Sequence, residues 1–125
     1  MIGKLYWVIM PFFDIINQKN SFKKRPALVI AKADDKDAII LPVSTITHKD
    51  NLNVKYDIEI DPSLYNRIKL KKICYVRTHK QTVVHIASLG GIIVDIKTDY
   101  QDLYLDILAK RDEFNEEINK QACSL

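Results

Sequence analysis

Three short polar segments of the 125-residue chain carry side chains that could act on a phosphate. In the first, Pro26 disfavours helical geometry at Arg25, so the guanidinium is held on extended backbone where a loop enters a strand. In the second, Ser44 and Thr45 place adjacent hydroxyls at a strand end. Such hydroxyls can bind a phosphate oxygen, or they can bond to their own backbone in a turn.

The third segment, Tyr75–Lys80, combines a second arginine, Arg77, with His79. An imidazole, whose ordinary pKa is about 6.5, can take or give a proton at neutral pH. Arg25 and Arg77 could stabilise a phosphorane, a hydroxyl could orient a phosphate oxygen, and His79 could activate a ribose 2′-OH. Together these residues predict RNA cleavage without a metal, although each taken singly is a weak signal that ordinary surface and turn residues also give.

The composition is that of one compact domain over residues 1–125, with 47% hydrophobic and 28% charged residues and only 3 Gly and 4 Pro. The longest apolar runs are far shorter than the ~20 residues of a membrane-spanning helix. Cys74 and Cys123 are too few for a disulfide framework, and no spacing of ligands indicates a metal site. We therefore expect reduced thiols, no cofactor, no metal and a cytoplasmic location.

The charges are unevenly distributed along the chain. Residues 1–98 hold 16 Lys and Arg against 9 Asp and Glu, whereas residues 99–125 hold 3 against 7. A polyanion would prefer the basic body, although both parts could be ordinary solvated faces.

The elements that must position the polar residues are strands and one helix. Residues 5–13 predict a strand buried on both faces, and residues 14–24 a long polar loop. Two apolar runs, residues 26–33 and 38–43, flank a charged turn and predict a hairpin.

The second half of the chain changes from strands to helix. Alternation of apolar and polar residues predicts strands over 54–60 and 68–78. Residues 81–96 suit short strands with one helical turn between them. Thr98 and Gln101 form a capping-box signature before a helix over residues 99–119 whose apolar stripe should pack on the sheet. The expected fold is mainly β (α+β), a bent antiparallel sheet or small barrel with a long C-terminal helix.

The order of these motifs is familiar over most of the chain. The segments are GKLYWVIMPF, KRPALVIA, ILPVST, ICYVRTHKQTVVH and SLGGI. In this order the chain resembles the MazF/PemK family of bacterial toxins, the ribonuclease halves of type II toxin–antitoxin pairs. The resemblance implies an SH3-like barrel, a homodimer, sequence-preferring cleavage of single-stranded RNA without metal, and inhibition by a cognate antitoxin, MazE-like or another acidic chain.

The resemblance also assigns the catalytic residues. Arg25 matches the active-site arginine of the family's RP motif, and Ser44 stands where the family usually has a threonine, with Thr45 beside it. Because the order of the two hydroxyl residues is reversed, either could serve. Arg77 matches an arginine that some PemK-like members use, and His79 stands where those members carry an aspartate.

RNA binding is expected around these residues, in a groove shared by two copies of the chain. Backbone phosphates there would be held by salt-sensitive contacts. Unpaired bases would stack on aromatic rings such as Phe12, Phe13 and Phe22, of which the first two could equally belong to the core. The residues expected to bind RNA are Lys23, Lys24, Thr78, Lys80 and Phe22.

Two other functions fit the same sequence. The related CcdB toxins share the fold and inhibit DNA gyrase without cutting RNA, and the RP arginine with its hydroxyl pair favours cleavage over this alternative. The chain could also be a catalytically silent module that binds RNA or an antitoxin, which the histidine at position 79 would signal.

Overall fold

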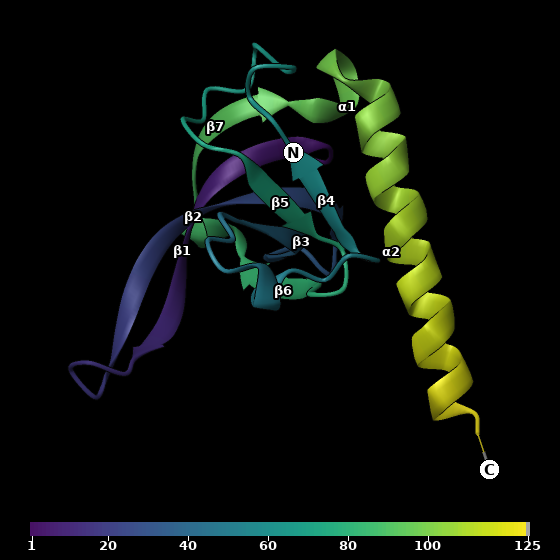
Figure 1. The fold of residues 1–125 in the computed structure, drawn as a ribbon, viewed down its shortest axis with the longest axis horizontal. Coiled ribbons are helices and arrows are strands. Elements are labelled where there is room, and N and C mark those ends of the chain that lie inside the picture. The colour runs from purple at the N-terminus through teal and green to yellow at the C-terminus, as the bar shows by residue number, and fades with distance from the viewer. Residues whose placement is uncertain (125) are drawn as a thin grey trace.

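The computed structural model describes residues 1–124, apart from the side chains of Phe12 and Phe13. A curled antiparallel sheet is flanked by one long C-terminal helix (Figure 1). The elements in chain order are β1 (Lys4–Asp14), β2 (Lys19–Lys32), β3 (Asp37–Ser44), the 3₁₀ turn η1 (Lys49–Asn51), β4 (Asp57–Ile60), β5 (Cys74–Arg77), β6 (Thr82–His85), the 3₁₀ turn η2 (Ile86–Ser88), β7 (Leu89–Asp95), α1 (Ile96–Asp99) and α2 (Gln101–Ala122).

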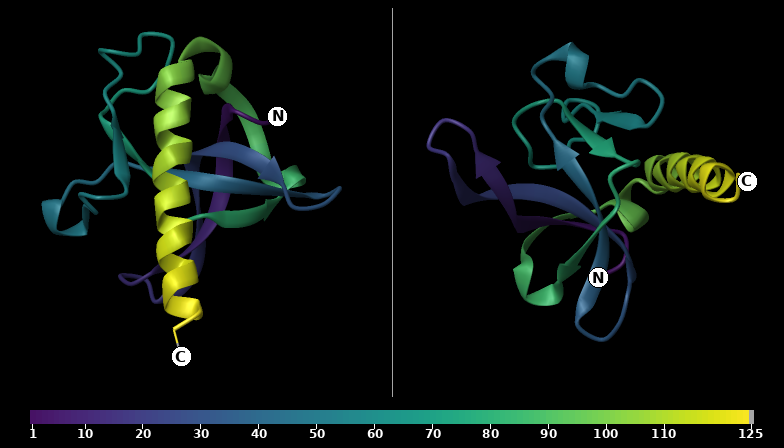
Figure 2. Two further views of the ribbon diagram at one scale, coloured as in Figure 1. Left: turned by 90° about the vertical axis from the view of Figure 1, so that its right-hand side faces the viewer. Right: turned by 90° about the horizontal axis from the view of Figure 1, so that it is seen from below.

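The described strands form one sheet in the order β4-β5-β3-β2-β1-β7, and β6 also pairs with β3. β3 is central because its two halves have different neighbours. Asp37–Ile40 pairs with β6, whereas Val43 and Ser44 pair with β5. This division bends the sheet into an incomplete barrel, and α2 runs along its side (Figure 2).

The core lies on both faces of β2 and β3. Leu28 and Ile30 belong to the larger cluster, which also holds residues of α2, whereas Ala27 and Val29 belong to a second cluster on the other face. The continuous apolar run of β2 is therefore explained by burial on both sides. The prediction of a bent antiparallel sheet with a long C-terminal helix is confirmed.

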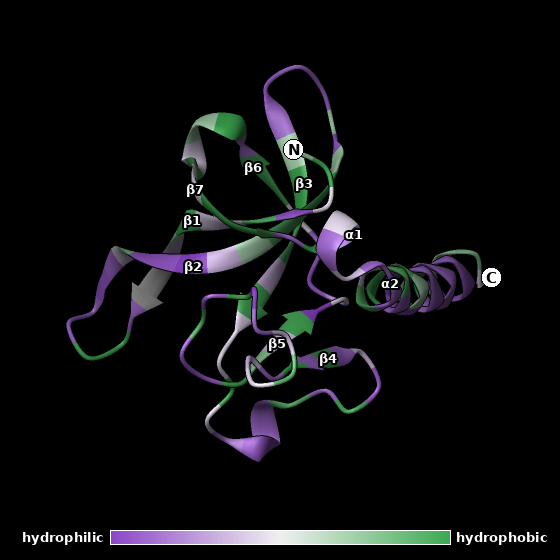
Figure 3. Ribbon diagram, turned by 90° about the horizontal axis from the view of Figure 1, so that it is seen from above, coloured by the Kyte–Doolittle hydropathy of each residue, from purple (hydrophilic) through white to green (hydrophobic). Residues whose placement is uncertain are grey.

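Helix α2 packs through its first turns. Leu103, Tyr104 and Ile107 are buried against the sheet, and further along Phe114 contacts the ring of Tyr56 edge-on at 5.1 Å between ring centres. Figure 3 shows hydrophilic colouring along the side of α2 turned away from the sheet. None of the helices within residues 1–124 is long and apolar enough to cross a membrane.

The predicted capping box at Thr98 is wrong, because the helical part of the chain begins earlier. Asp95 caps α1: its carboxylate accepts a hydrogen bond from the Thr98 amide at 3.0 Å and another from the Thr98 hydroxyl at 3.0 Å. α2 starts only after Tyr100, whose side chain makes no capping bond.

The predicted loop over residues 14–24 is also wrong. β1 and β2 pair continuously from Leu5 with Leu28 to Asp14 with Lys19, so that only a short turn remains. The Asp14 carboxylate closes this turn by accepting hydrogen bonds from the amides of Ile16 and Asn17. The outer part of the hairpin projects from the body (Figure 1), so that Ile15, Ile16 and Phe22 are exposed there and β1 is not buried on both faces.

Two predicted strands are shorter than expected, while the ambiguous segment behaves as expected. β4 begins only at Asp57, because the Asn53 side chain accepts from the amides of Lys55 and Tyr56 and holds a turn there. Residues 61–73 form turns and loop before β5. Residues 81–96 give two strands separated by one 3₁₀ turn, as predicted.

Ile107→Ala should lower the free energy of unfolding by about 2–5 kcal/mol, because this fully buried side chain joins α2 to the larger core cluster. Leu105→Ala on the same helix is the matched control. Its side chain is 53% exposed, so the loss should stay under about 1 kcal/mol. Urea unfolding of the three proteins measures both values, and equal losses would contradict the packing of α2 through the face that carries Ile107.

Candidate active site

Arg25 and Ser44 form the centre of the site. In the ladder between β2 and β3, Ala27 pairs with Pro42, so positions 25 and 44 face each other two residues further along. The Arg25 guanidinium donates from Nη1 to the Ser44 Oγ at 3.3 Å. Both side chains are half-buried. The pairing of two neighbouring strands thus holds a cationic donor beside a hydroxyl, a combination that can bind the oxygens of a phosphate.

A groove surrounds this pair. It consists of two adjoining hollows of about 480 and 350 Å³, and Arg25, Ser44, Arg77 and Lys80 line both of them. These residues come from β2, β3, β5 and the turn after β5. The structure therefore brings together the predicted residues of all three polar segments.

The groove is cationic throughout. Lys23 also lines the larger hollow and Thr45 the smaller one. Among the described residues that line the two hollows there is no aspartate, glutamate or histidine. The site is thus suited to binding an anion and stabilising negative charge, and its uncharged polar residues carry hydroxyl groups or, at Asn51 and Gln81, amides.

Arg77 is fixed by a buried carboxylate. Asp57 lies opposite it in the ladder between β4 and β5, and the Arg77 Nε donates to the Asp57 Oδ1 at 3.1 Å. The Arg77 Nη2 also donates to the carbonyl of Asn51 at 3.0 Å. The Asp57 side chain has no exposed surface and accepts a further bond from the Asn53 amide at 2.7 Å. Asp57, which the sequence analysis did not single out, therefore orients Arg77 from outside the groove and offsets part of its charge.

His79 lies away from the groove, which contradicts its predicted role as the base. Its ring stacks at 6.0 Å on the ring of Tyr56 and meets Phe114 of α2 edge-on, and its side chain is only 12% exposed. The Nδ1 atom is 3.8 Å from the Asp57 Oδ1 and makes no hydrogen bond. The reason is that β5 ends at Arg77 and the following turn directs His79 beneath the helix.

The environment of His79 favours the neutral imidazole. Burial lowers the pKa of His79 below its ordinary value, and the charges of Arg77 and Lys80 act in the same direction against the attraction of Asp57. We interpret His79 as part of the packing between α2 and the sheet.

Of the other residues predicted to bind RNA, Thr78 is buried, whereas Lys24 and Phe22 are exposed. Thr78 is fully buried, and its hydroxyl donates to the Tyr56 carbonyl at 2.6 Å, so its prediction as an RNA contact is wrong. Lys24 is exposed, and its Nζ lies 5.6 Å from the centre of the Trp7 ring. Phe22 is 73% exposed on the projecting hairpin, where stacking on RNA stays a prediction. The side chains of Phe12 and Phe13 lie outside the described residues.

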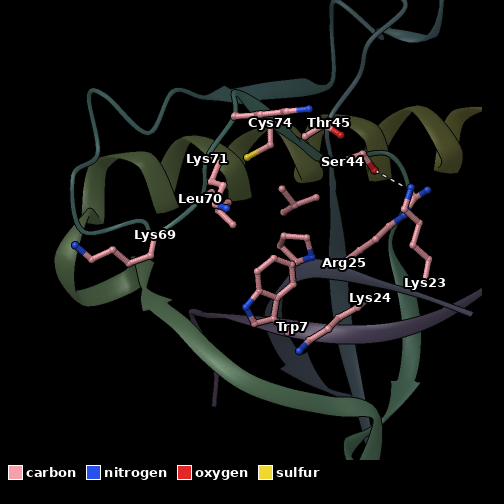
Figure 4. A pocket seen from close by; sticks show the side chains of 13 residues that line it. Trp7, Lys23, Lys24, Arg25, Ser44, Thr45, Lys69, Leu70, Lys71 and Cys74 are labelled. Carbon is pink, nitrogen blue, oxygen red and sulfur yellow. Dashed lines mark hydrogen bonds between the residues drawn. The ribbon is translucent and has the colours of Figure 1, made fainter.

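A third hollow of about 370 Å³ adjoins the groove at Arg25 and Ser44 (Figure 4). Its far side comes from the loop before β5, with Lys69, Leu70 and Lys71 among its walls. The sequence analysis did not single out these residues. The only signal for them is the basic run of residues 69–72, which does not reveal that the loop folds towards the site.

Comparison with known proteins is informative at the level of structure. The sequence matches no protein-family model and no curated protein. Among solved structures, the toxin MazF-mt6 of Mycobacterium tuberculosis is similar, with a TM-score of 0.59 over 88% of this chain and 96% of that chain, at 10% identity. The chain has a MazF-like fold. The fold that the sequence resemblance implied is therefore confirmed, and at this identity the likeness concerns the fold alone.

The burial of His79 has a consequence for stability. Because its pKa is lower in the folded than in the unfolded chain, where it is about 6.5, the unfolded chain binds the proton more tightly. The contribution of His79 to stability should be complete above about pH 6.5 and be lost as the pH falls from there towards the folded pKa. His79→Phe keeps an aromatic ring between Tyr56 and Phe114 but has no imidazole to protonate. The variant should therefore lose less stability than the parent protein as the pH falls.

Melting temperatures measured from pH 8 down to pH 5 test this expectation. His48→Phe is the matched control, because His48 is exposed, and it should follow the parent protein. Parallel curves for the parent and His79→Phe would contradict the expectation.

Proposed function

We propose that this chain is the toxin of a type II toxin–antitoxin pair and that it cleaves single-stranded RNA without a metal ion. The observation that carries the proposal is the pair of Arg25 and Ser44, held side by side by β2 and β3 inside a cationic groove. The MazF-like fold supports it. The sequence resemblance supports it as well, since Arg25 matches the active-site arginine of the family's RP motif and Ser44 stands where the family usually has a threonine.

The chemistry follows from what the groove contains. The ribose 2′ oxygen attacks the adjacent phosphorus, and the bond from phosphorus to the 5′ oxygen breaks, which leaves a 2′,3′-cyclic phosphate and a 5′-hydroxyl end. Arg25 stabilises the charge that develops on the phosphoryl oxygens, and Ser44 orients one of them. Because no described residue of the groove is a histidine or a carboxylate, solvent takes the proton of the 2′ hydroxyl and supplies one to the 5′ oxygen.

The remaining cations bind the backbone of the substrate. Lys23, Arg77 and Lys80 lie around the reacting phosphate and attract its neighbours, so binding should weaken as salt concentration rises. The same cationic surface suits an acidic antitoxin, whose binding would block RNA. A homodimer belongs to the proposal as well, since the resemblance implies it.

A second candidate is a silent module that binds RNA and does not cut it. The lack of a proton-transfer group among the described residues of the groove favours this alternative. The difference between the two candidates is measurable in a single cleavage experiment.

Arg25→Ala should lower the rate of RNA cleavage at least about a hundredfold, because it removes the cation beside the reacting phosphate. The measurement incubates parent and variant with a long single-stranded RNA in excess EDTA and maps the new ends. Arg111→Ala is the matched control, since it removes the same charge from α2, outside the groove.

Each result of that experiment has a clear meaning. The proposal is supported if the parent and Arg111→Ala make discrete cuts and Arg25→Ala does not. Undiminished cleavage by Arg25→Ala would overturn the role of Arg25. Salt-sensitive RNA binding by the parent without any product identifies the silent module. A change in DNA supercoiling by gyrase without RNA cleavage identifies the CcdB-like alternative.

Ser44→Ala should lower the cleavage rate about 10- to 100-fold, whereas Thr45→Ala should change it less than about threefold. The reason is that Ser44 bonds to Arg25, while the exposed Thr45 side chain has no such bond. Single-turnover rates on one mapped cut site compare the two variants directly. A larger loss for Thr45→Ala would assign the active hydroxyl to Thr45 and refute the assignment of Ser44.

A further inference from the structure

The third hollow differs from the groove in the chemistry of its walls. Apolar side chains from four strands and a loop form much of its surface, and Figure 4 shows Trp7, Leu70 and Cys74 around a common space. The apolar side chains are Trp7, Pro26, Val43, Leu70 and Cys74. The hollow, called the side pocket below, has the size of a small-molecule site and is open to the groove at Arg25, Ser44 and Thr45.

Cations surround the side pocket in two groups. One group comes from β2 and consists of Lys23, Lys24 and Arg25, and the other comes from the loop before β5 and consists of Lys69, Lys71 and Lys72. In Figure 4, Lys69 lies across the pocket from Lys23 and Arg25. None of the described residues lining the pocket is acidic. The pocket therefore suits a flat apolar group that carries negative charge on both sides.

An unpaired nucleobase in an RNA chain has this chemistry. Its faces are apolar, and a phosphate lies on either side of its ribose. The indole of Trp7 offers a stacking surface, and a cation already lies near that ring, with the Lys24 Nζ 5.6 Å from its centre. Because Lys24 is exposed, its ammonium can turn to a phosphate when a base enters.

We propose that the side pocket holds an unpaired base next to the phosphate contacted by Arg25 and Ser44, and that this base sets the sequence preference of cleavage. The inference rests on the proposed function. The side pocket is continuous with the groove, because Arg25, Ser44 and Thr45 line both of them. The base of a nucleotide whose phosphate lies at Arg25 and Ser44 therefore reaches the side pocket directly, with no further nucleotide between them. Lys69, Lys71 and Lys72 of the loop before β5 then neutralise the phosphate on the other side of this base.

Trp7 provides the readout, because it is the sole tryptophan of the chain. The probes are short 2′-O-methyl oligonucleotides of A, C or U, which lack the attacking hydroxyl and cannot be cleaved. An abasic phosphodiester strand of equal length keeps the charges and removes the bases. At least one oligonucleotide should quench the fluorescence of Trp7, and the abasic strand should not.

Leu70→Phe fills part of the side pocket and should lower the affinity for the quenching oligonucleotide about tenfold, with little effect on the abasic strand. Leu64→Phe is the matched control. It makes the same substitution in the same loop at a residue that is 75% exposed and does not line the pocket, and it should leave the affinity unchanged. On a long RNA, Leu70→Phe should also alter which sites are cut.

Three results would overturn the inference. Equal quenching by the abasic strand would show that the pocket region senses only phosphates. Equal losses for Leu70→Phe and Leu64→Phe would place the base elsewhere. Quenching by an acidic peptide with an aromatic residue, without quenching by any oligonucleotide, would assign the pocket to a protein partner.

The outcome is separable from that of the proposed function. RNA cleavage by the parent without quenching of Trp7 by any oligonucleotide leaves the proposed function standing and removes the side pocket from it. Base-dependent quenching by a protein that cuts no RNA removes the cleavage activity and keeps the pocket as a base-binding site.

Discussion

The register between β2 and β3 is the constraint on which the site depends. Leu28 pairs with Leu41, and both side chains are fully buried in the larger core cluster. A slip of one residue would turn one of these side chains to the opposite face of the sheet, which a different set of buried residues already fills. The same slip would carry Arg25 to the opposite face, away from Ser44. The core of the sheet thus determines the geometry of the polar pair, although neither polar residue contributes to that core.

The distribution of charge around the groove also depends on the pairing of strands, here of β4 with β5. The buried carboxylate of Asp57 lies behind Arg77 and holds the guanidinium in place, so its negative charge does not line the groove. Six of the seven acidic residues over 99–125 lie on α2 and the seventh, Asp99, ends α1, and no described residue of either helix lines the groove or the side pocket. A net charge of only +3 is therefore compatible with a surface that is strongly cationic where an anion would bind.

The sequence predicted the parts of the fold that periodicity and burial determine. The apolar runs of β2 and β3, the turn between them and the long helix were recognisable, and Arg25, Ser44 and Arg77 do meet in the groove. The projecting hairpin was not recognisable, because most of its described side chains are exposed, including those of Ile15, Ile16 and Phe22, and burial therefore imposes no pattern on them.

The position of His79 shows a different limit of sequence reasoning. Alternation along a strand would put residues 77 and 79 on the same face, but β5 ends at Arg77, and the amide of Lys80 bonds back to the Arg77 carbonyl at 3.1 Å. This turn lets His79 meet Phe114, a residue far away in the sequence. The loop that brings Lys69 and Leu70 to the side pocket depends in the same way on contacts that no local pattern contains.

The absence of a histidine or carboxylate from the described part of the groove affects how such a site could work. Without a positioned base, acceleration must come from charge stabilisation, which depends on donors that are already oriented before the reaction begins. Arg25 meets this requirement because two strands and a hydroxyl hold it, and Arg77 meets it through Asp57. A rigid sheet would then favour catalysis. A guanidinium that is held in place needs no reorientation as charge develops, whereas a mobile one, like water, would have to reorient.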